Sequence, residues 1–317
     1  MVSLRGRFLR SFLRRKGNFN PLKHPDAVSI IRNLYQINVE ETTLKGFSVC
    51  RERTLGGTPY ERIFEDGKEH TGKVVLYFHG GAYISPLISA YREAAPDVCR
   101  AGDCEVILLD YRTAPQHTFP AQLDDAMDLW LELTERQGYL PENILIGGDS
   151  AGSNLTLALM LKLRDEQRPL PCAAFCISVW ADMTLSGKSY MENYSRDVMF
   201  GEKGVQPSEE SRTAFMQSDI FCFTGDADRT DPYVSPVYGD YNGFPPMLFT
   251  VGSHEMLLSD TLTIVEKLRA EGCEVECDVK EGMFHVYTLY SKFLPEAADS
   301  NKRILRFVSK HLKNLNT

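Results

Sequence analysis

Ser150 stands in the pattern GDSAG at 148–152, between an apolar run at 143–147 and a run of helical character at 153–163. This order of strand, Gly-x-Ser-x-Gly and helix is typical of a nucleophile elbow, where a serine hydroxyl is exposed at the end of a strand. Glycine and serine are also common in turns, so the pattern is compatible with an ordinary turn. A catalytic serine needs a base, an acid and oxyanion donors elsewhere in the chain.

A histidine and a glutamate occupy the places where the base and the acid are expected. His285 follows the last apolar run at 274–279, and in an α/β chain with a serine elbow the histidine comes last, after the acid. The loop after the run at 246–251 offers Glu255 and Asp260. Asp260 starts a helical run, where N-capping would account for it, so we predict Glu255 as the acid.

Small residues follow the apolar run at 73–78, in the sequence HGGAY at 79–83. Such a turn can expose consecutive backbone N–H groups, which is what the oxyanion of acyl transfer requires. A tight turn with an incidental histidine is the alternative. Together with the serine pattern downstream, HGGAY favours acyl-transfer chemistry.

Alternating apolar and helical runs predict the scaffold that positions these groups. A doubly wound α/β fold is expected, with a mostly parallel central sheet and helices on both faces. The predicted strands are 47–53 and 60–65, which would pair antiparallel, then 73–78, 105–109, 143–147, 173–179, 246–251 and 274–279. The predicted helices are 123–136, 154–164, 260–270 and 296–312.

Residues 181–240 interrupt this rhythm, because no strong strand pattern occurs there. A segment of about sixty residues is too long for a bare loop in a compact domain. We therefore predict a helical cap formed by residues 1–44 and 181–240. The catalytic α/β domain would comprise residues 45–180 and 241–317.

Composition excludes several classes of protein. The chain has 317 residues and a net charge of −8, which argues against a nucleic-acid partner. Its eight cysteines form no CxxC pair and no zinc-ligand spacing, so we expect no structural metal, no cofactor and a reducing cytoplasmic location.

The first sixteen residues combine cations with apolar side chains at helical spacing. This pattern predicts an amphipathic helix, which either packs its apolar face on the protein or contacts a membrane surface. No stretch approaches the length of a transmembrane span. The apolar positions are Leu4, Phe8, Leu9, Phe12 and Leu13.

Several segments together carry a family resemblance. They are HGGAY at 79–83, DYRTAPQHTFPAQLDD at 110–125, GDSAGSNL at 148–155, DPYVSP at 231–236, GSHEMLLSD at 252–260 and GMFHVY at 282–287. Over about two hundred residues the chain resembles a bacterial member of the hormone-sensitive lipase family of α/β-hydrolases. The resemblance implies the α/β-hydrolase fold, a cap and carboxylic ester hydrolysis.

The resemblance also implies the residues of the active site. The nucleophile would be Ser150, the base His285 and the acid Glu255, where many family members have aspartate. The oxyanion hole would lie in the loop of Gly80, Gly81 and Ala82, with the N–H groups of Gly81, Ala82 and Ala151 as donors.

One residue departs from the family pattern. The usual His-Gly-Gly-Gly loop has Ala82 at its last position here, so a Cβ projects near the site and a positive φ becomes costly. We therefore expect esters of bulky tertiary alcohols to be poor substrates.

Other residues of these motifs are interpreted as scaffold. Asp149 is expected to stabilise the turn as a hydrogen-bond acceptor. The loop after the run at 105–109 would be braced by Tyr111, Arg112, Pro115 and Asp124. The aromatic residues that either line an acyl pocket or belong to the core are Phe200, Phe215, Phe221 and Phe223.

The sequence thus favours a serine carboxylesterase for small, short-chain esters. A lactone or amide hydrolase needs the same triad, and a ligand-binding receptor on the same scaffold is a further alternative. The resemblance also implies a homodimer through an edge strand as one alternative for its assembly.

Overall fold

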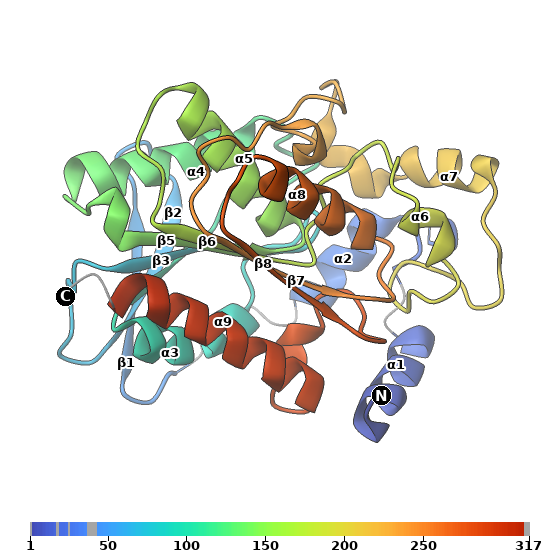
Figure 1. Ribbon diagram of the computed structural model, residues 1–317, viewed down its shortest axis with the longest axis horizontal. Coiled ribbons are helices and arrows are strands. Elements are labelled where there is room, and N and C mark those ends of the chain that lie inside the picture. Colours follow the sequence, from blue (N-terminus) through green and yellow to red (C-terminus); the bar gives the residue numbers. More distant parts are fainter. Residues whose placement is uncertain (1, 17–18, 25, 37–42, 314–317) are drawn as a thin grey trace.

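A computed structural model describes residues 2–16, 19–24, 26–36 and 43–313. In this part of the chain, an eight-stranded sheet has the order β1-β2-β4-β3-β5-β6-β7-β8 (Figure 1). The β1–β2 and β2–β4 pairs are antiparallel and the others parallel. The strands are β1 (Phe47–Arg53), β2 (Pro59–Glu65), β3 (Val74–Phe78), β4 (Glu105–Leu109), β5 (Ile144–Asp149), β6 (Ala173–Ile177), β7 (Met247–Gly252) and β8 (Val275–Lys280). Each coincides with a predicted run to within two residues at either end, so the predicted α/β fold is confirmed.

Helices cover both faces of this sheet (Figure 1). One face carries α3 (Ser89–Gly102) and α9 (Pro295–Lys313), and the other carries α4 (Ala121–Leu131), α5 (Ala151–Asp165) and α8 (Leu258–Ala270). The sequence did not predict α3, because Pro96 lies inside it and few large apolar side chains mark its buried face. The predicted helix 123–136 is α4 continued by a π-helical turn, Glu132–Arg136.

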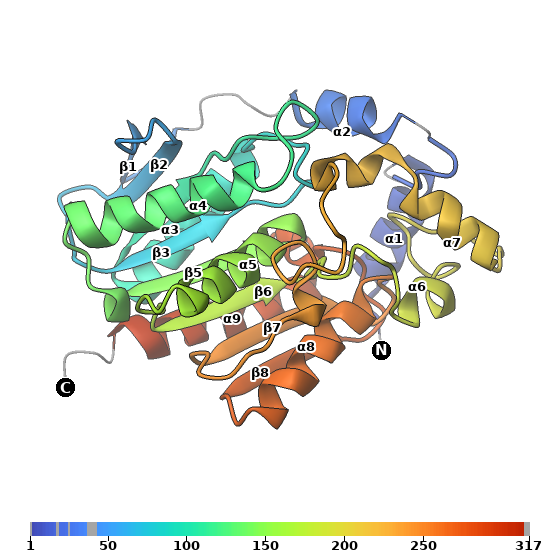
Figure 2. The same cartoon turned by 90° about the horizontal axis from the view of Figure 1, so that it is seen from above.

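A further group of helices gathers at one end of the molecule (Figure 2). It contains α1 (Leu4–Lys16), α2 (Ala27–Gln36), α6 (Ser189–Glu192) and α7 (Glu209–Met216). Asp219 accepts hydrogen bonds from the N–H groups of Ala27 and Val28, each at 3.1 Å, and so joins the inserted segment to α2. We propose that these helices form the cap. Residues 1, 17–18, 25 and 37–42 of the expected cap lie outside the described residues.

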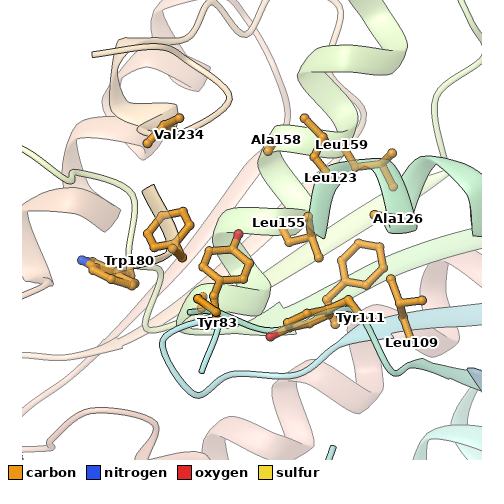
Figure 3. Close-up of a cluster of buried hydrophobic side chains, with 14 of the residues drawn as sticks. Tyr83, Leu109, Tyr111, Leu123, Ala126, Leu155, Ala158, Leu159, Trp180 and Val234 are labelled. Atoms are coloured by element: carbon orange, nitrogen blue, oxygen red, sulfur yellow. The ribbon is translucent and has the colours of Figure 1, made fainter. Parts of the chain in front are cut away.

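Aromatic side chains fill the core next to the HGGAY loop (Figure 3). The ring of Tyr83 lies 5.7 Å from that of Tyr111 and 4.4 Å from that of Phe223. The Tyr83 hydroxyl donates to Asn154 Oδ1 at 2.7 Å, which ties the loop to α5. Buried side chains of the core therefore hold the HGGAY loop in place.

The carboxyl ends of the parallel strands meet at one edge of the sheet, where ligands usually bind in α/β proteins. The HGGAY loop follows β3, and Ser150 follows β5. Glu255 follows β7, and His285 follows β8. The topology thus brings these four parts of the sequence to the same edge.

Candidate active site

Ser150 occupies a strained turn between β5 and α5. Its backbone has φ 53° and ψ −118°, a conformation that residues other than glycine rarely adopt. The turn requires glycines on both sides: a Cβ on Gly152 would lie 1.9 Å from the carbonyl oxygen of Phe78, and one on Gly148 would lie 2.5 Å from the Gly152 backbone. These contacts explain the Gly-x-Ser-x-Gly pattern in physical terms.

Hydrogen bonds join Ser150, His285 and Glu255 in one line. Ser150 Oγ lies 2.9 Å from His285 Nε2, and His285 Nδ1 lies 3.1 Å from Glu255 Oε2. Ser150 and His285 are each 7% exposed, and Glu255 is fully buried. The structure therefore brings together the three side chains that the sequence proposes as a triad.

Glu255 is held by a second set of hydrogen bonds. Its Oε1 accepts from the Gly252 N–H at 2.5 Å and from the Ser178 hydroxyl at 2.8 Å. Both donors bind the same oxygen, so the other oxygen, Oε2, is the one that faces His285. This arrangement fixes the orientation of the carboxylate.

Asp260, the other candidate acid, has a different role. It is the third residue of α8, so the N-capping interpretation is wrong. Its Oδ2 accepts from the N–H groups of Ala181 and Asp182, at 2.9 and 3.0 Å. Burial, with the nearby charge of Asp182, raises the pKa of Asp260 well above its usual value. Asp260 thus fixes the segment that leads into the insertion.

Ser178, which no sequence pattern singled out, lies one residue beyond β6 with φ 49°. Its hydroxyl donates to Glu255 Oε1 and accepts from the Val286 N–H at 3.0 Å. One side chain therefore contacts both the acid and the residue after His285. The available signal was a polar residue at the end of an apolar run, on the edge where the site lies.

The loop after β3 provides two of the expected oxyanion donors. Gly81 has φ 109° and Ala82 has φ 55°, and both line the cavity that contains Ser150. Within the described ranges, no hydrogen bond is made by the N–H groups of Gly81, Ala82 or Ala151. Ala82 does adopt the positive φ that we expected to be costly. Buried hydrogen bonds of Gly80 and Tyr83, on either side of Ala82, hold the loop in this conformation.

Gly80 must be removed from the expected oxyanion hole. Its N–H lies 3.0 Å from Asp149 Oδ1 and 3.0 Å from the Tyr91 hydroxyl. A donor that is already engaged cannot point at a substrate oxygen. Its neighbour Gly81 is therefore the first available donor of the loop.

Asp149 is an acceptor in the turn, as predicted. Besides the Gly80 N–H, its carboxyl group accepts from the hydroxyls of Tyr77 and Tyr91 at 2.9 and 3.2 Å. Burial raises the pKa of Asp149 to about 6, against the opposing effect of these hydrogen bonds. Asp149 thus ties the serine turn to the oxyanion loop.

His79 braces the same loop from inside the core. Burial lowers its pKa to about 4, so the ring is neutral at pH 7. Nδ1 lies 2.8 Å from the Gly80 carbonyl oxygen, which requires Nδ1 to carry the proton. Because the Gly80 carbonyl and the Gly81 N–H belong to one peptide plane, this bond also orients the Gly81 donor.

The loop after β4 is braced as expected, with one correction. The Tyr111 hydroxyl donates to the His79 carbonyl oxygen at 2.6 Å. The Arg112 backbone N–H and guanidinium bind Asp125, at 2.8 and 2.9 Å. Asp124, which we expected to brace this loop, is exposed, and Asp125 is the residue that fixes it.

Ser150 and His285 open into a largely apolar cavity of about 980 Å³, including the part open to solvent. Of the four candidate pocket aromatics, Phe200 and Phe215 line it, and the Phe200 ring lies 5.0 Å from that of His285. Phe221 and Phe223 instead pack against Trp180, at 5.2 and 5.5 Å between ring centres.

Among the described residues, no group of three or more His, Cys, Asp or Glu side chains is placed to hold a metal ion. Within the same ranges, no helix is both apolar and long enough to cross a membrane.

Comparison with known proteins identifies the family. Residues 75–289 match the family model described as alpha/beta hydrolase fold. An acetyl-hydrolase of Streptomyces hygroscopicus is 33% identical over 225 residues, which are 71% of each chain. The crystal structure of EstE5 soaked with p-nitrophenyl butyrate is similar, with TM-score 0.83 and 28% identity over 98% of this chain and all of that one.

A further solved structure is an esterase from the bacterial hormone-sensitive lipase family. It has TM-score 0.81 and 28% identity, covering 98% of this chain and 99% of that chain. The matched region contains the serine turn, the glutamate and the histidine described above. The chain therefore belongs to the hormone-sensitive lipase family of α/β-hydrolases and is a carboxylic ester hydrolase.

Proposed function

We propose that Ser150 is the nucleophile, His285 the general base and Glu255 the acid that orients it. The observation that carries this proposal is the buried hydrogen-bonded line from Ser150 Oγ through His285 to Glu255. His285 Nε2 takes the hydroxyl proton as Ser150 Oγ attacks the ester carbonyl carbon. The N–H groups of Gly81, Ala82 and Ala151 stabilise the oxyanion that forms.

Collapse of the tetrahedral intermediate breaks the ester bond. The leaving alcohol takes the proton from His285, and the acyl group remains on Ser150. A water molecule then gives its proton to His285 and attacks the acyl carbon. The second collapse returns the proton to Ser150 Oγ and releases the acid.

The substrates that fit this site are neutral esters with short acyl chains. The cavity is lined mostly by apolar side chains, and EstE5, whose crystals were soaked with p-nitrophenyl butyrate, has a similar fold. A smaller cavity of about 240 Å³ lies beside the first. The residues that line both cavities, and so separate them, are Leu185, Tyr190, Phe215 and Met256.

We expect Phe215→Ala to extend the range of acyl chains. Removing this ring joins the two cavities, so the ratio of kcat/KM for p-nitrophenyl octanoate to that for the butyrate should rise about tenfold or more. The matched control is Phe221→Ala, which removes a buried ring that does not line either cavity. If the ratio is unchanged in Phe215→Ala, or rises equally in the control, Phe215 does not separate the two cavities.

The purified protein should hydrolyse p-nitrophenyl acetate and butyrate and react covalently with a fluorophosphonate. A ligand-binding receptor without an activated serine would do neither. Parallel assays with a lactone and an anilide distinguish an esterase from the two related hydrolases, and the highest kcat/KM is expected for the ester.

The compartment is inferred from the cysteines. All eight lie in the described part of the chain and all are free thiols. Their reduced state supports a cytoplasmic location for the enzyme, where thiols are kept reduced. Mass spectrometry after rapid acid quenching of cells and alkylation of the denatured protein should find all eight alkylated, the buried ones included.

A further inference from the structure

The N-terminal helix α1 has two apolar faces, of which one is unused by the fold. Leu9 and Leu13 are buried and pack with Val198, Met283 and Phe284. The second face is exposed: Leu4 is 82% exposed, Phe8 66% and Phe12 51%. These three residues are four apart, so they form one stripe along the helix. One apolar face of α1 thus packs on the protein, as expected, and the other face is exposed.

Polar contacts fix the inner face of α1 to the body of the protein. Arg10 lies 2.7 Å from Nδ1 of His254, the residue before Glu255. The Arg14 guanidinium donates to the carbonyl oxygens of Ser195 and Arg196 at 3.2 and 3.1 Å. With these contacts in place, the direction in which the stripe faces is set by the fold.

The exposed face of α1 is cationic as well as apolar. Arg5, Arg7 and Arg15 are exposed, and the helix contains no acidic residue. By helical periodicity, Arg5 and Arg7 lie on opposite sides of the stripe and Arg15 lies on it. The whole chain has a net charge of −8, so this helix is a positive region on an acidic protein.

A cation–π contact links α1 to a segment that reaches the active-site cavity. The Arg5 guanidinium lies 5.8 Å from the centre of the Phe293 ring, and Phe293 is 42% exposed. Leu289, on the same segment, is also 42% exposed and lines the active-site cavity. Helix α1 thus contacts a segment, residues 289–293, whose first residue lines the active-site cavity.

We propose that α1 docks the enzyme on an anionic lipid surface, with Leu4, Phe8 and Phe12 inserted among the lipids and Arg5, Arg7 and Arg15 at the headgroups. Apolar side chains flanked by long cationic ones are what an interfacial helix requires. A second copy fits this face poorly, because a two-fold contact would bring the cations of two α1 helices together. The proposal concerns binding and does not depend on the assignment of the triad.

Vesicle flotation tests this docking. The chain of 317 residues should float with vesicles of phosphatidylglycerol and phosphatidylcholine, and the bound fraction should fall in 0.5 M salt, as expected for an electrostatic contribution. Phe8→Ser with Phe12→Ser should lower the partition coefficient about tenfold or more, because two inserted rings are lost. Arg7→Glu with Arg15→Glu should abolish the preference for anionic over zwitterionic vesicles.

Matched variants separate docking from general hydrophobicity. Leu55 and Leu140 are 78% and 54% exposed outside α1, so Leu55→Ser with Leu140→Ser should leave flotation unchanged. Hydrolysis of soluble p-nitrophenyl butyrate should be unchanged in all three variants, which shows that they are folded. The proposal would be overturned if the Phe8/Phe12 variant floated as much as the unchanged protein. It would also be overturned if the unchanged protein floated as much with vesicles of phosphatidylcholine alone as with anionic vesicles. If light scattering shows that the unchanged protein is a dimer and the Phe8/Phe12 variant a monomer, and neither binds lipid, the exposed face of α1 contacts a second copy instead.

Discussion

Replacing Ser150 with alanine is expected to lower kcat for p-nitrophenyl butyrate by about 10⁶-fold, the loss typical of a nucleophile in a serine triad. Only the hydroxyl that attacks the ester is removed. The fold should persist, because the backbone strain of φ 53° is present in both proteins and the Ser150 N–H still donates to the Ile177 carbonyl oxygen. Labelling by a fluorophosphonate should disappear with the activity.

A neighbouring serine provides the matched control. The hydroxyl of Ser153 lies 2.7 Å from the Gly148 carbonyl oxygen and accepts from the Ile177 N–H at 2.9 Å, inside the protein. Ser153→Ala should therefore lower stability while the folded enzyme still reacts with the probe. Ser150 would not be the nucleophile if Ser150→Ala were still labelled and kept a kcat within about tenfold of the unchanged enzyme. Such a loss is far smaller than the one expected for removal of a nucleophile.

Much of the fold follows from local sequence patterns. Buried parallel strands are apolar over their whole length, and β5, which is fully buried, is visible in the sequence for that reason. The order of serine, glutamate and histidine was equally readable, because each follows a predicted strand. Helix α3 could not be predicted from the sequence, because Pro96 interrupts its pattern. In addition, Arg92 is buried there because it pairs with Glu61, which lies 2.5 Å away but is distant in sequence.

The errors in the site share a physical cause. Whether the Gly80 N–H is available depends on Asp149, 69 residues away, and this pairing leaves no local pattern. The same is true of Ser178, whose two partners lie 77 and 108 residues away. Predicting Asp124 instead of Asp125 was an error of one position, because two successive residues of a helix point to different faces. Residue types were thus predictable, while the partners of individual polar atoms required the structure.

Replacing Glu255 with glutamine is expected to lower kcat by about 10⁴-fold, the effect of an amide at this position of a triad. The reason lies in the second set of hydrogen bonds. Gly252 and Ser178 both donate to the Oε1 position, so the amide oxygen of glutamine must stay there and its NH₂ group must face His285 Nδ1. Nδ1 then has to accept a hydrogen bond, which places the ring proton on Nε2. In that tautomer, Nε2 cannot take the proton of Ser150.

The substitution of the same residue by aspartate separates charge and tautomer from packing. Glu255→Asp keeps an acceptor for the Nδ1 proton and shortens the side chain by one methylene, so we expect a kcat well above that of Glu255→Gln. KM for p-nitrophenyl butyrate should change little in either variant, because Glu255 is fully buried and does not line the cavity. A folded Glu255→Gln enzyme with a kcat within about tenfold of the original would contradict the role of Glu255, since a wrong tautomer cannot be that mild. Equal losses in both variants would instead mean that the position of the carboxylate, and not the tautomer it imposes, limits the reaction.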